Sequence, residues 1–218
     1  MSDLPPYLSL SERIWYYAFR ILCGAIFFFL VFPLVVIIPL SFNAVPFFTF
    51  TKEMLAFDPA GYSLKWYEDF FTNLNWQGAV QNSVIIAIFS TLISTTLGTL
   101  AALGLSRAQM PYRTLIMSIL ISPMIVPLII SAAGMFFFYS RIGIQGTHIA
   151  VILAHAALGT PFVVITVTAT LSGFDNNLIR ASSSLGAPPS TTFFRVIVPL
   201  ITPGVISGAL FAFITSFD

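Results

Sequence analysis

The sequence predicts an all-α polytopic membrane protein with about five transmembrane helices. Of its 218 residues, 57% are hydrophobic and only 8% are charged, whereas soluble domains carry about 25% charged residues. The apolar residues are gathered into runs, and several of these runs are long enough to cross about 30 Å of hydrocarbon. Composition and patterning together therefore place the chain in a membrane.

Charge and cysteine content narrow the class further. The formal net charge is +1, so the sequence indicates no nucleic-acid partner. The single cysteine, Cys23, lies inside an apolar run, where a thiol serves packing more often than chemistry. With one cysteine, no disulfide can form within the chain.

The first membrane span is predicted at 21–42, after a polar and cytoplasmic N-terminal segment at 1–20. The apolar run is interrupted only by Pro33 and Pro39. It is too long for the core of a signal peptide, and we interpret it as a retained membrane helix.

Residues 43–78 are predicted to form an external, periplasmic loop that is rich in aromatic side chains. Two interpretations of these side chains stay open: a belt at the lipid headgroups, or a docking surface for a soluble partner. The aromatic residues are Phe47, Phe48, Phe50, Phe57, Tyr62, Trp66, Tyr67, Phe70, Phe71 and Trp76.

The membrane domain is predicted to follow at 79–218. Its spans are expected at 79–106, 114–139 and 148–171, with a last one from Leu200 onward. The chain is still apolar where it reaches Asp218, so we expect a further C-terminal segment.

Small residues recur every four positions in two of these spans. Helix association in lipid depends on close backbone approach, so such stripes predict tight packing, either within the chain or across a subunit interface. The stripes are Ser90, Ser94, Gly98 and Ala102, and Gly204, Gly208, Ala212 and Ser216.

Basic residues near the span ends predict the orientation, because cytoplasmic loops carry an excess of Lys and Arg. Six of the nine basic residues fall on the same side as the N-terminus: Arg13, Arg20, Arg107, Arg113, Arg180 and Arg195. The other three, Lys52, Lys65 and Arg141, fall on the opposite side. The N-terminus is therefore predicted to be cytoplasmic.

A polar element at 172–199 separates the fourth and fifth spans. The Asp-Asn-Asn run at 175–177 offers capping side chains for a first helix over 178–185. At Gly186 the chain can turn with φ > 0 at little steric cost.

A second helix of this element is predicted at about 190–198. Pro188 and Pro189 are tolerated in its first turn, and Pro199 is expected to end it. Two interpretations of the element stay open. It is either a handle for another protein or a simple linker in which Gly186 is an ordinary helix stop.

Catalytic and metal-binding patterns are missing from the sequence. His148 and His155 are the only histidines, too few for a recognisable metal site, and we expect no catalytic residue, metal or cofactor. The sequence contains no P-loop, so ATP hydrolysis would fall to a partner. The first four spans carry no central acidic residue that could bind a coupling ion, which argues against a proton- or sodium-coupled carrier.

The intramembrane His155 admits two interpretations. It either lines a pathway or is a neutral side chain that hydrogen-bonds to a neighbouring helix.

The polar element resembles the EAA loop of permease subunits of binding-protein-dependent ABC importers. The matching residues are Arg180-Ala181-Ser182, Gly186-Ala187 after three further residues, Phe193, Val198-Pro199 and Pro203. The departures from the family pattern are Arg180 in place of Glu and Ser182 in place of the second Ala. They bear on any ionic role of the first position, whereas the glycine turn and the helix spacing are kept.

Other segments are similar to the polyamine branch of this family. They are 62–67 (Tyr-Ser-Leu-Lys-Trp-Tyr), Asn82-Ser83, 185–187 and 213–218. The resemblance implies a MetI-like fold with a sixth span, in the inner membrane of a bacterium. It implies a permease that imports putrescine or spermidine. Iron(III), thiamine or sulfate remain alternative cargoes, and a membrane enzyme or an assembly factor without an ATPase remains an alternative class.

The resemblance also implies partners and coupling residues. The partners are cytoplasmic ATP-binding subunits, a second permease subunit (homologous or identical), a periplasmic or lipid-anchored solute-binding protein, and membrane lipid. Leu178, Leu185 and Phe193 would be apolar anchors on the ATP-binding subunit, with Arg180 and Arg195 at the rim. The full set of coupling residues is Leu178, Arg180, Ala181, Ser182, Leu185, Gly186, Ala187, Phe193, Arg195 and Pro199.

Overall fold

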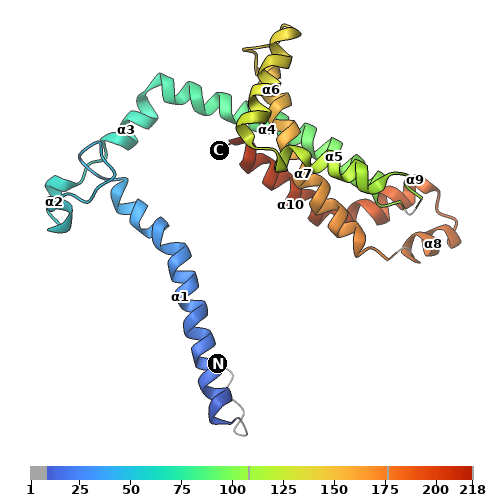
Figure 1. Cartoon of the computed structure of the whole chain (residues 1–218), viewed down its shortest axis with the longest axis horizontal. Coiled ribbons are helices and arrows are strands. Elements are labelled where there is room, and N and C mark those ends of the chain that lie inside the picture. The colour runs from blue at the N-terminus through green and yellow to red at the C-terminus, as the bar shows by residue number, and fades with distance from the viewer. Residues whose placement is uncertain (1–8, 108, 176, 218) are drawn as a thin grey trace. The chain divides into compact units, whose positions relative to one another are not determined.

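The computed structural model describes residues 9–107, 109–175 and 177–217. Asn176 and Asp218, considered above as a capping residue and as the apolar chain end, lie outside the described residues. Within these ranges the fold is helical throughout, with no strand and one isolated bridge between Asn43 and Tyr62. The chain divides into two compact units, Met1–Gln77 and Gly78–Asp218, whose elements are labelled in Figure 1.

The spans agree with the predicted fold class. Four of the described helices are long and apolar enough to cross a membrane, and counting one bent pair as a span brings the number to five. The chain is therefore an all-α polytopic membrane protein.

The first unit opens with helix α1 (Leu10–Leu40), which begins well before the predicted start of the span at residue 21. A capping box explains the earlier start. The Ser9 backbone N–H donates to Glu12 Oε2 at 2.8 Å, and Ser9 Oγ accepts from the Glu12 N–H at 3.4 Å. The helix therefore includes most of the segment that was predicted as a polar head.

Short helices follow in the loop: α2 (Lys52–Leu55), the 3₁₀ turn η1 (Pro59–Gly61) and α3 (Lys65–Thr72). The buried Asn43 organises their connection. Its side-chain Nδ2 donates to the backbone carbonyls of Phe47 and Thr49 at 2.9 and 2.8 Å. Its backbone carbonyl accepts a hydrogen bond from Trp66 Nε1 at 2.8 Å.

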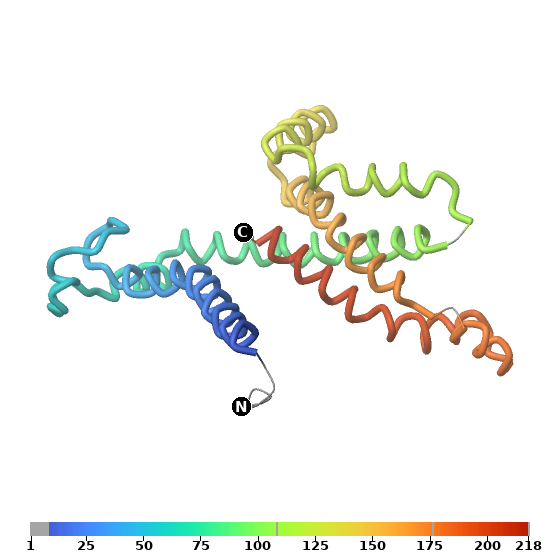
Figure 2. Tube along the Cα trace, turned by 60° about the horizontal axis from the view of Figure 1, so that its bottom comes forward, coloured from blue at the N-terminus to red at the C-terminus, as the bar shows by residue number. Residues whose placement is uncertain are grey.

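The second unit contains most of α4 (Leu74–Leu105), together with α5 (Arg113–Ile125), α6 (Leu128–Arg141), α7 (His148–Ser172) and α10 (Val198–Phe217). Helices α7 and α10 lie side by side in both Figure 1 and Figure 2. The buried core of the unit comprises Ala102, Val163, Val167, Ile201 and Ala212.

The two small-residue stripes are buried at helix contacts inside this unit. A Cβ on Gly98 would lie 2.6 Å from Val163 Cβ, and one on Gly208 would lie 2.8 Å from Val163 Cα. Ser94 Oγ donates to the Ala156 carbonyl at 3.0 Å. The predicted close packing is confirmed, and it occurs within one chain, between α4, α7 and α10.

The third predicted span, 114–139, is wrong as a single helix. The structure divides this run into α5 and α6, whose axes are bent by 100°. Val126 precedes Pro127 and has φ −68° and ψ 134°, because the proline ring disfavours the helical conformation in the residue before it. The run of apolar residues therefore continues across a point where the helix is interrupted.

Candidate functional site

The polar element contains helix α8 (Asn177–Ser184) and helix α9 (Pro189–Thr192). Asp175 Oδ1 accepts a hydrogen bond from the Asn177 N–H at 2.9 Å, which satisfies one of the unpaired donors at the start of α8. The predicted capping role of Asp175 is therefore confirmed.

The turn after α8 is a Schellman motif. Gly186 has φ +76°, its N–H bonds to the Ser183 carbonyl at 3.0 Å, and the Ala187 N–H bonds to the Ser182 carbonyl at 3.1 Å. This pattern needs a left-handed residue, and glycine adopts that conformation without a steric penalty. The predicted glycine turn is confirmed.

The two short helices are held together by a side-chain hydrogen bond. Ser182 Oγ pairs with Thr192 Oγ1, and Thr192 is buried. Ser182 stands where the family pattern has alanine, so its hydroxyl adds a polar link between α8 and α9. Ala181 is exposed and Ala187 is half-buried.

The second helix was predicted to end at Pro199, but it continues past that residue. Helical structure runs unbroken over Pro189–Phe217, through the π-helical turn η2 (Phe193–Ile197), in which the Val198 N–H bonds to the Phe193 carbonyl. A π turn shifts the hydrogen-bond register and leaves a carbonyl unpaired, so the missing N–H of Pro199 costs little there. The polar element therefore continues into α10 without a loop.

Apart from the buried Thr192, the described side chains of the element are exposed or half-buried. Leu178 and Leu185 are 42% and 88% exposed, as an anchor for a partner requires. Phe193 is half-buried, whereas the neighbouring Phe194 is 68% exposed. Sequence reasoning named Phe193 and did not consider Phe194, the more exposed of the two side chains. The widened π turn changes which residues face outward, and a helical period of 3.6 residues does not reveal it.

The charged residues of the element are exposed. Arg180 lies on α8 and Arg195 lies in η2, and both are open to a partner. Pro199 is also exposed. The element thus presents apolar side chains and two cations on short helices next to the long α10.

A second polar cluster joins three membrane helices. His155 Nδ1 of α7 lies 2.9 Å from Ser216 Oγ and 3.1 Å from the Ser216 carbonyl of α10. Ser90 Oγ of α4 donates to Ser216 Oγ at 2.8 Å. The interpretation of His155 as hydrogen-bonded to a neighbouring helix is confirmed. The other histidine, His148, pairs through Nε2 with Asn82 Oδ1 at 3.1 Å.

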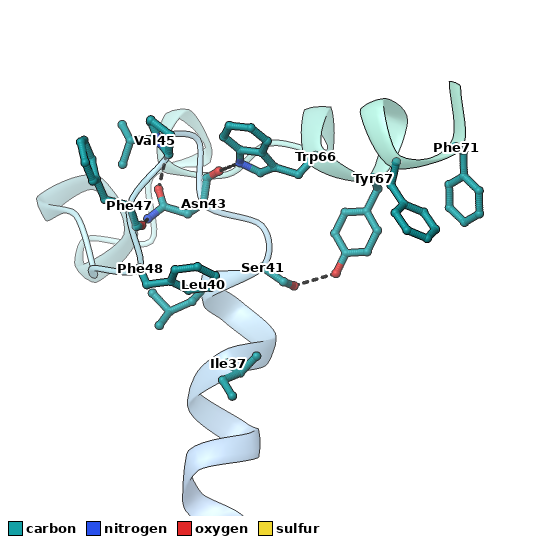
Figure 3. Close-up of a pocket in the computed structure, with 12 residues that line it drawn as sticks. Ile37, Leu40, Ser41, Asn43, Val45, Phe47, Phe48, Trp66, Tyr67 and Phe71 are labelled. Carbon is teal, nitrogen blue, oxygen red and sulfur yellow. Dashed lines mark hydrogen bonds between the residues drawn. The ribbon is translucent and has the colours of Figure 1, made fainter. Parts of the chain in front are cut away.

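The aromatic loop of the first unit and the end of α1 line an open pocket of about 750 Å³. Figure 3 shows Trp66 and Tyr67 on one side and the end of α1 on the other. Ser41 Oγ and the Tyr67 hydroxyl are 2.7 Å apart, and Lys65 Nζ lies 4.7 Å from the centre of the Trp66 ring. These contacts hold Trp66 and Tyr67 in position, whichever of the two predicted roles of the aromatic residues applies.

Comparison with known proteins identifies the family. Residues 94–218 match the family described as binding-protein-dependent transport system inner membrane component. The chain belongs to this family. It is the permease subunit of a binding-protein-dependent ABC importer and a multi-pass inner-membrane protein.

The similarity to two relatives of the permease extends over nearly the whole chain, and a third relative matches a shorter part. The chain is 30% identical over 193 residues to the spermidine/putrescine transport system permease protein PotC of Haemophilus influenzae, covering 88% of this chain and 72% of the relative. The PotC protein of Escherichia coli K12 is also 30% identical, over 89% of this chain and 70% of its own length. The molybdenum transport permease ModB of Mycobacterium bovis is 30% identical over 64% of this chain and 58% of its own length.

A solved structure has the same fold. It is the crystal structure of a bacterial ABC transporter involved in the import of the acidic polysaccharide alginate, with a TM-score of 0.67 and 17% identity. The match covers 97% of this chain and 74% of the other.

Proposed function

We propose that the permease imports polyamines such as putrescine or spermidine. The observation that carries this proposal is the length of the similarity to the two PotC proteins, which extends over 193 and 194 residues. Relatives named for other solutes match over shorter stretches, such as 137 residues for a sulfoquinovosyl glycerol permease and 154 for a molybdenum permease. The segments outside the shared membrane core therefore favour the polyamine branch.

The polar element is the proposed attachment site for a cytoplasmic ATP-binding subunit. Leu178, Leu185 and Phe194 would fill apolar pockets on that subunit, and Arg180 and Arg195 would contact its charged rim. The coupling set includes Phe193 as the half-buried support of Phe194, since their rings are 5.1 Å apart. This arrangement requires a cytoplasmic N-terminus, in agreement with the distribution of basic residues.

The continuity of α9, η2 and α10 supports a route for the coupling motion. ATP-driven closure of the partner subunits would displace the polar element, and an unbroken helix would carry that displacement into α10. Residues 173–175, which lead from α7 into α8, are not helical. We therefore propose that α10, more than α7, moves with the ATP-binding subunit. A second permease subunit and a solute-binding protein would complete the importer.

Phe194→Ala is expected to weaken binding of the ATP-binding subunit at least tenfold, the scale of losing an interface anchor. The measurement is the dissociation constant of the detergent-purified permease complex for that subunit. Phe137→Ala on α6 is the matched control, because Phe137 is also 68% exposed but lies outside the polar element. Equal losses in the two variants would remove Phe194 from the interface.

Transport itself is tested with the complete importer in proteoliposomes. Wild-type complex with its ATP-binding subunits and loaded solute-binding protein should accumulate labelled putrescine or spermidine when ATP is supplied. Labelled sulfate, thiamine and iron(III) are the comparison solutes. ATP-dependent uptake of one of these solutes, without polyamine uptake, would refute the proposed cargo.

A further inference from the structure

Threonine hydroxyls in the membrane helices follow two patterns. Those of Thr96, Thr160 and Thr166 donate to the carbonyl four residues earlier, at 2.8, 2.7 and 2.9 Å. This back-bonding is the ordinary way to satisfy a hydroxyl in a helix that has no water around it. The hydroxyls of the second pattern do not bond back, and they need a different explanation.

Thr91, Thr95 and Thr99 of α4 follow the second pattern. Their Oγ1 atoms are buried, and none of them has a hydrogen-bond partner in the part of the chain that the structure describes; Thr168 of α7 carries a fourth such hydroxyl. Residues four apart lie on one face of a helix, with a rise of about 6 Å per step. The three side chains therefore form one row of unpaired hydroxyls, which we call the hydroxyl row.

An unpaired buried hydroxyl is costly. Burial without a partner costs about 1–3 kcal/mol on the evidence of protein mutations, and the preceding carbonyl of α4 could have removed that cost, as it does at Thr96. Such an unpaired hydroxyl recurs on three successive turns of α4. The recurrence indicates that these hydroxyls bind a polar group that is not part of the chain. In an importer, the partner that comes and goes is the solute.

His155 adds an acceptor near the outer end of the row, beside the residue that precedes Thr91. His155 Nδ1 lies 3.1 Å from the Ser216 carbonyl and 2.9 Å from Ser216 Oγ. In the tautomer that donates from Nδ1 to the carbonyl, Nε2 carries the lone pair, and no described residue hydrogen-bonds to Nε2. Through the Ser90–Ser216 hydrogen bond, the ring is tied to α4 just before Thr91.

The chemistry of these groups fits a ligand that only donates. An ammonium group has three N–H donors and no acceptor, and hydroxyl oxygens and an imidazole lone pair accept without adding a charge. Acidic residues are absent from the described parts of α4, α7 and α10. Neutral acceptors bind a cation weakly enough to release it, which transport requires.

We propose that the hydroxyl row and Nε2 of His155 accept hydrogen bonds from the ammonium groups of the solute as it crosses the membrane. This inference rests on the proposed polyamine function. Steps of about 6 Å between hydroxyls are comparable with the reach of a four-carbon diamine. The two ammonium groups of one diamine therefore match two adjacent hydroxyls of the row.

The test compares three variants of the complete importer in proteoliposomes, with labelled putrescine as the probe. The combined change Thr91→Val, Thr95→Val and Thr99→Val removes the hydroxyls at nearly constant volume. The combined change to serine at the same positions keeps them. Thr96→Val, whose hydroxyl already bonds to Leu92, is the matched control.

The valine variant should lose at least about tenfold in uptake rate, since hydrogen bonds to charged groups are strong. The serine variant should stay within about threefold and Thr96→Val within about twofold of wild type. The valine variant should melt no lower than wild type, because it removes unpaired buried hydroxyls. Wild-type uptake by the valine variant, or an equal loss in the serine variant, would overturn the proposal.

His155 is tested in the same assay. His155→Gln places an amide oxygen near the position of Nε2 and should retain more uptake than His155→Leu, by about tenfold. Equal uptake by the two variants would remove His155 from the solute path. A wild-type importer that takes up none of the polyamines would instead refute the proposed function, which separates the two failures.

Discussion

Gly186→Val should reduce solute uptake strongly while the membrane helices stay folded. Gly186 has φ +76°, a conformation that a β-branched residue adopts only with strain of about 1–3 kcal/mol. An added Cβ would meet no atom within 4 Å, so the effect is conformational and not a clash. Relief of the strain would turn α8 away from α9, and we expect uptake to fall at least about tenfold.

A graded series separates backbone conformation from side-chain size. Gly186→Asn should be milder than Gly186→Val, because asparagine tolerates the left-handed region. Gly173→Ala is the matched control, since Gly173 follows α7 with φ −89° and its added Cβ meets only the Thr170 carbonyl, at 3.8 Å.

The readout is ATP-dependent uptake in proteoliposomes together with co-purification of the ATP-binding subunit. We expect Gly173→Ala to stay within about twofold of wild type in both measurements. If Gly186→Val imports solute at the wild-type rate, the polar element does not couple transport to ATP hydrolysis.

The features that sequence reasoning predicted correctly depend on local patterns. Runs of apolar residues predicted the spans. The turn at Gly186 was predictable because glycine, unlike other residues, adopts a positive φ without a steric penalty. The small-residue stripes also follow a local period, so the packing faces of α4 and α10 were visible in advance. Which helices they would contact was not visible, because Ser94 meets Ala156 across 62 positions of sequence.

The features that sequence reasoning missed depend on backbone direction. The break at Val126 and Pro127 lies inside an apolar run, and hydropathy does not change where a helix bends. The rule for residues before proline could have indicated it. At Pro199 the opposite error occurred, because a proline was taken as a helix end. The π turn ahead of it carries the helix on, and that turn also exposes Phe194 in place of Phe193.

Gly98→Ala is expected to lower the stability of the permease. Its Cβ would lie 2.6 Å from Val163 Cβ and 3.2 Å from the Thr160 carbonyl, and both neighbours belong to the well-packed α7. Overpacking of this kind costs about 1–3 kcal/mol. Glycine to alanine in an unconstrained helix has the opposite sign, a gain of about 0.5–1 kcal/mol.

Gly104→Ala supplies that unconstrained case on the same helix, because an added Cβ there meets no atom within 4 Å. Thermal melting of the purified permease complex should therefore shift downward for Gly98→Ala and slightly upward for Gly104→Ala. Melting shifts of the same sign in the two variants would contradict the role of Gly98 in the contact.

Val163→Gly in the Gly98→Ala background is a test of direct contact. It removes the Cβ and Cγ1 atoms that the new methyl group meets. Val163 is fully buried in the core, so Val163→Gly alone lowers stability, but it should lower stability less in the Gly98→Ala background than in the wild-type chain. That difference would show that α4 and α7 are held at a distance set by one small residue. Because Ser90 and the hydroxyl row lie on the same helix as Gly98, a shift of α4 away from α7 in Gly98→Ala should also lower uptake.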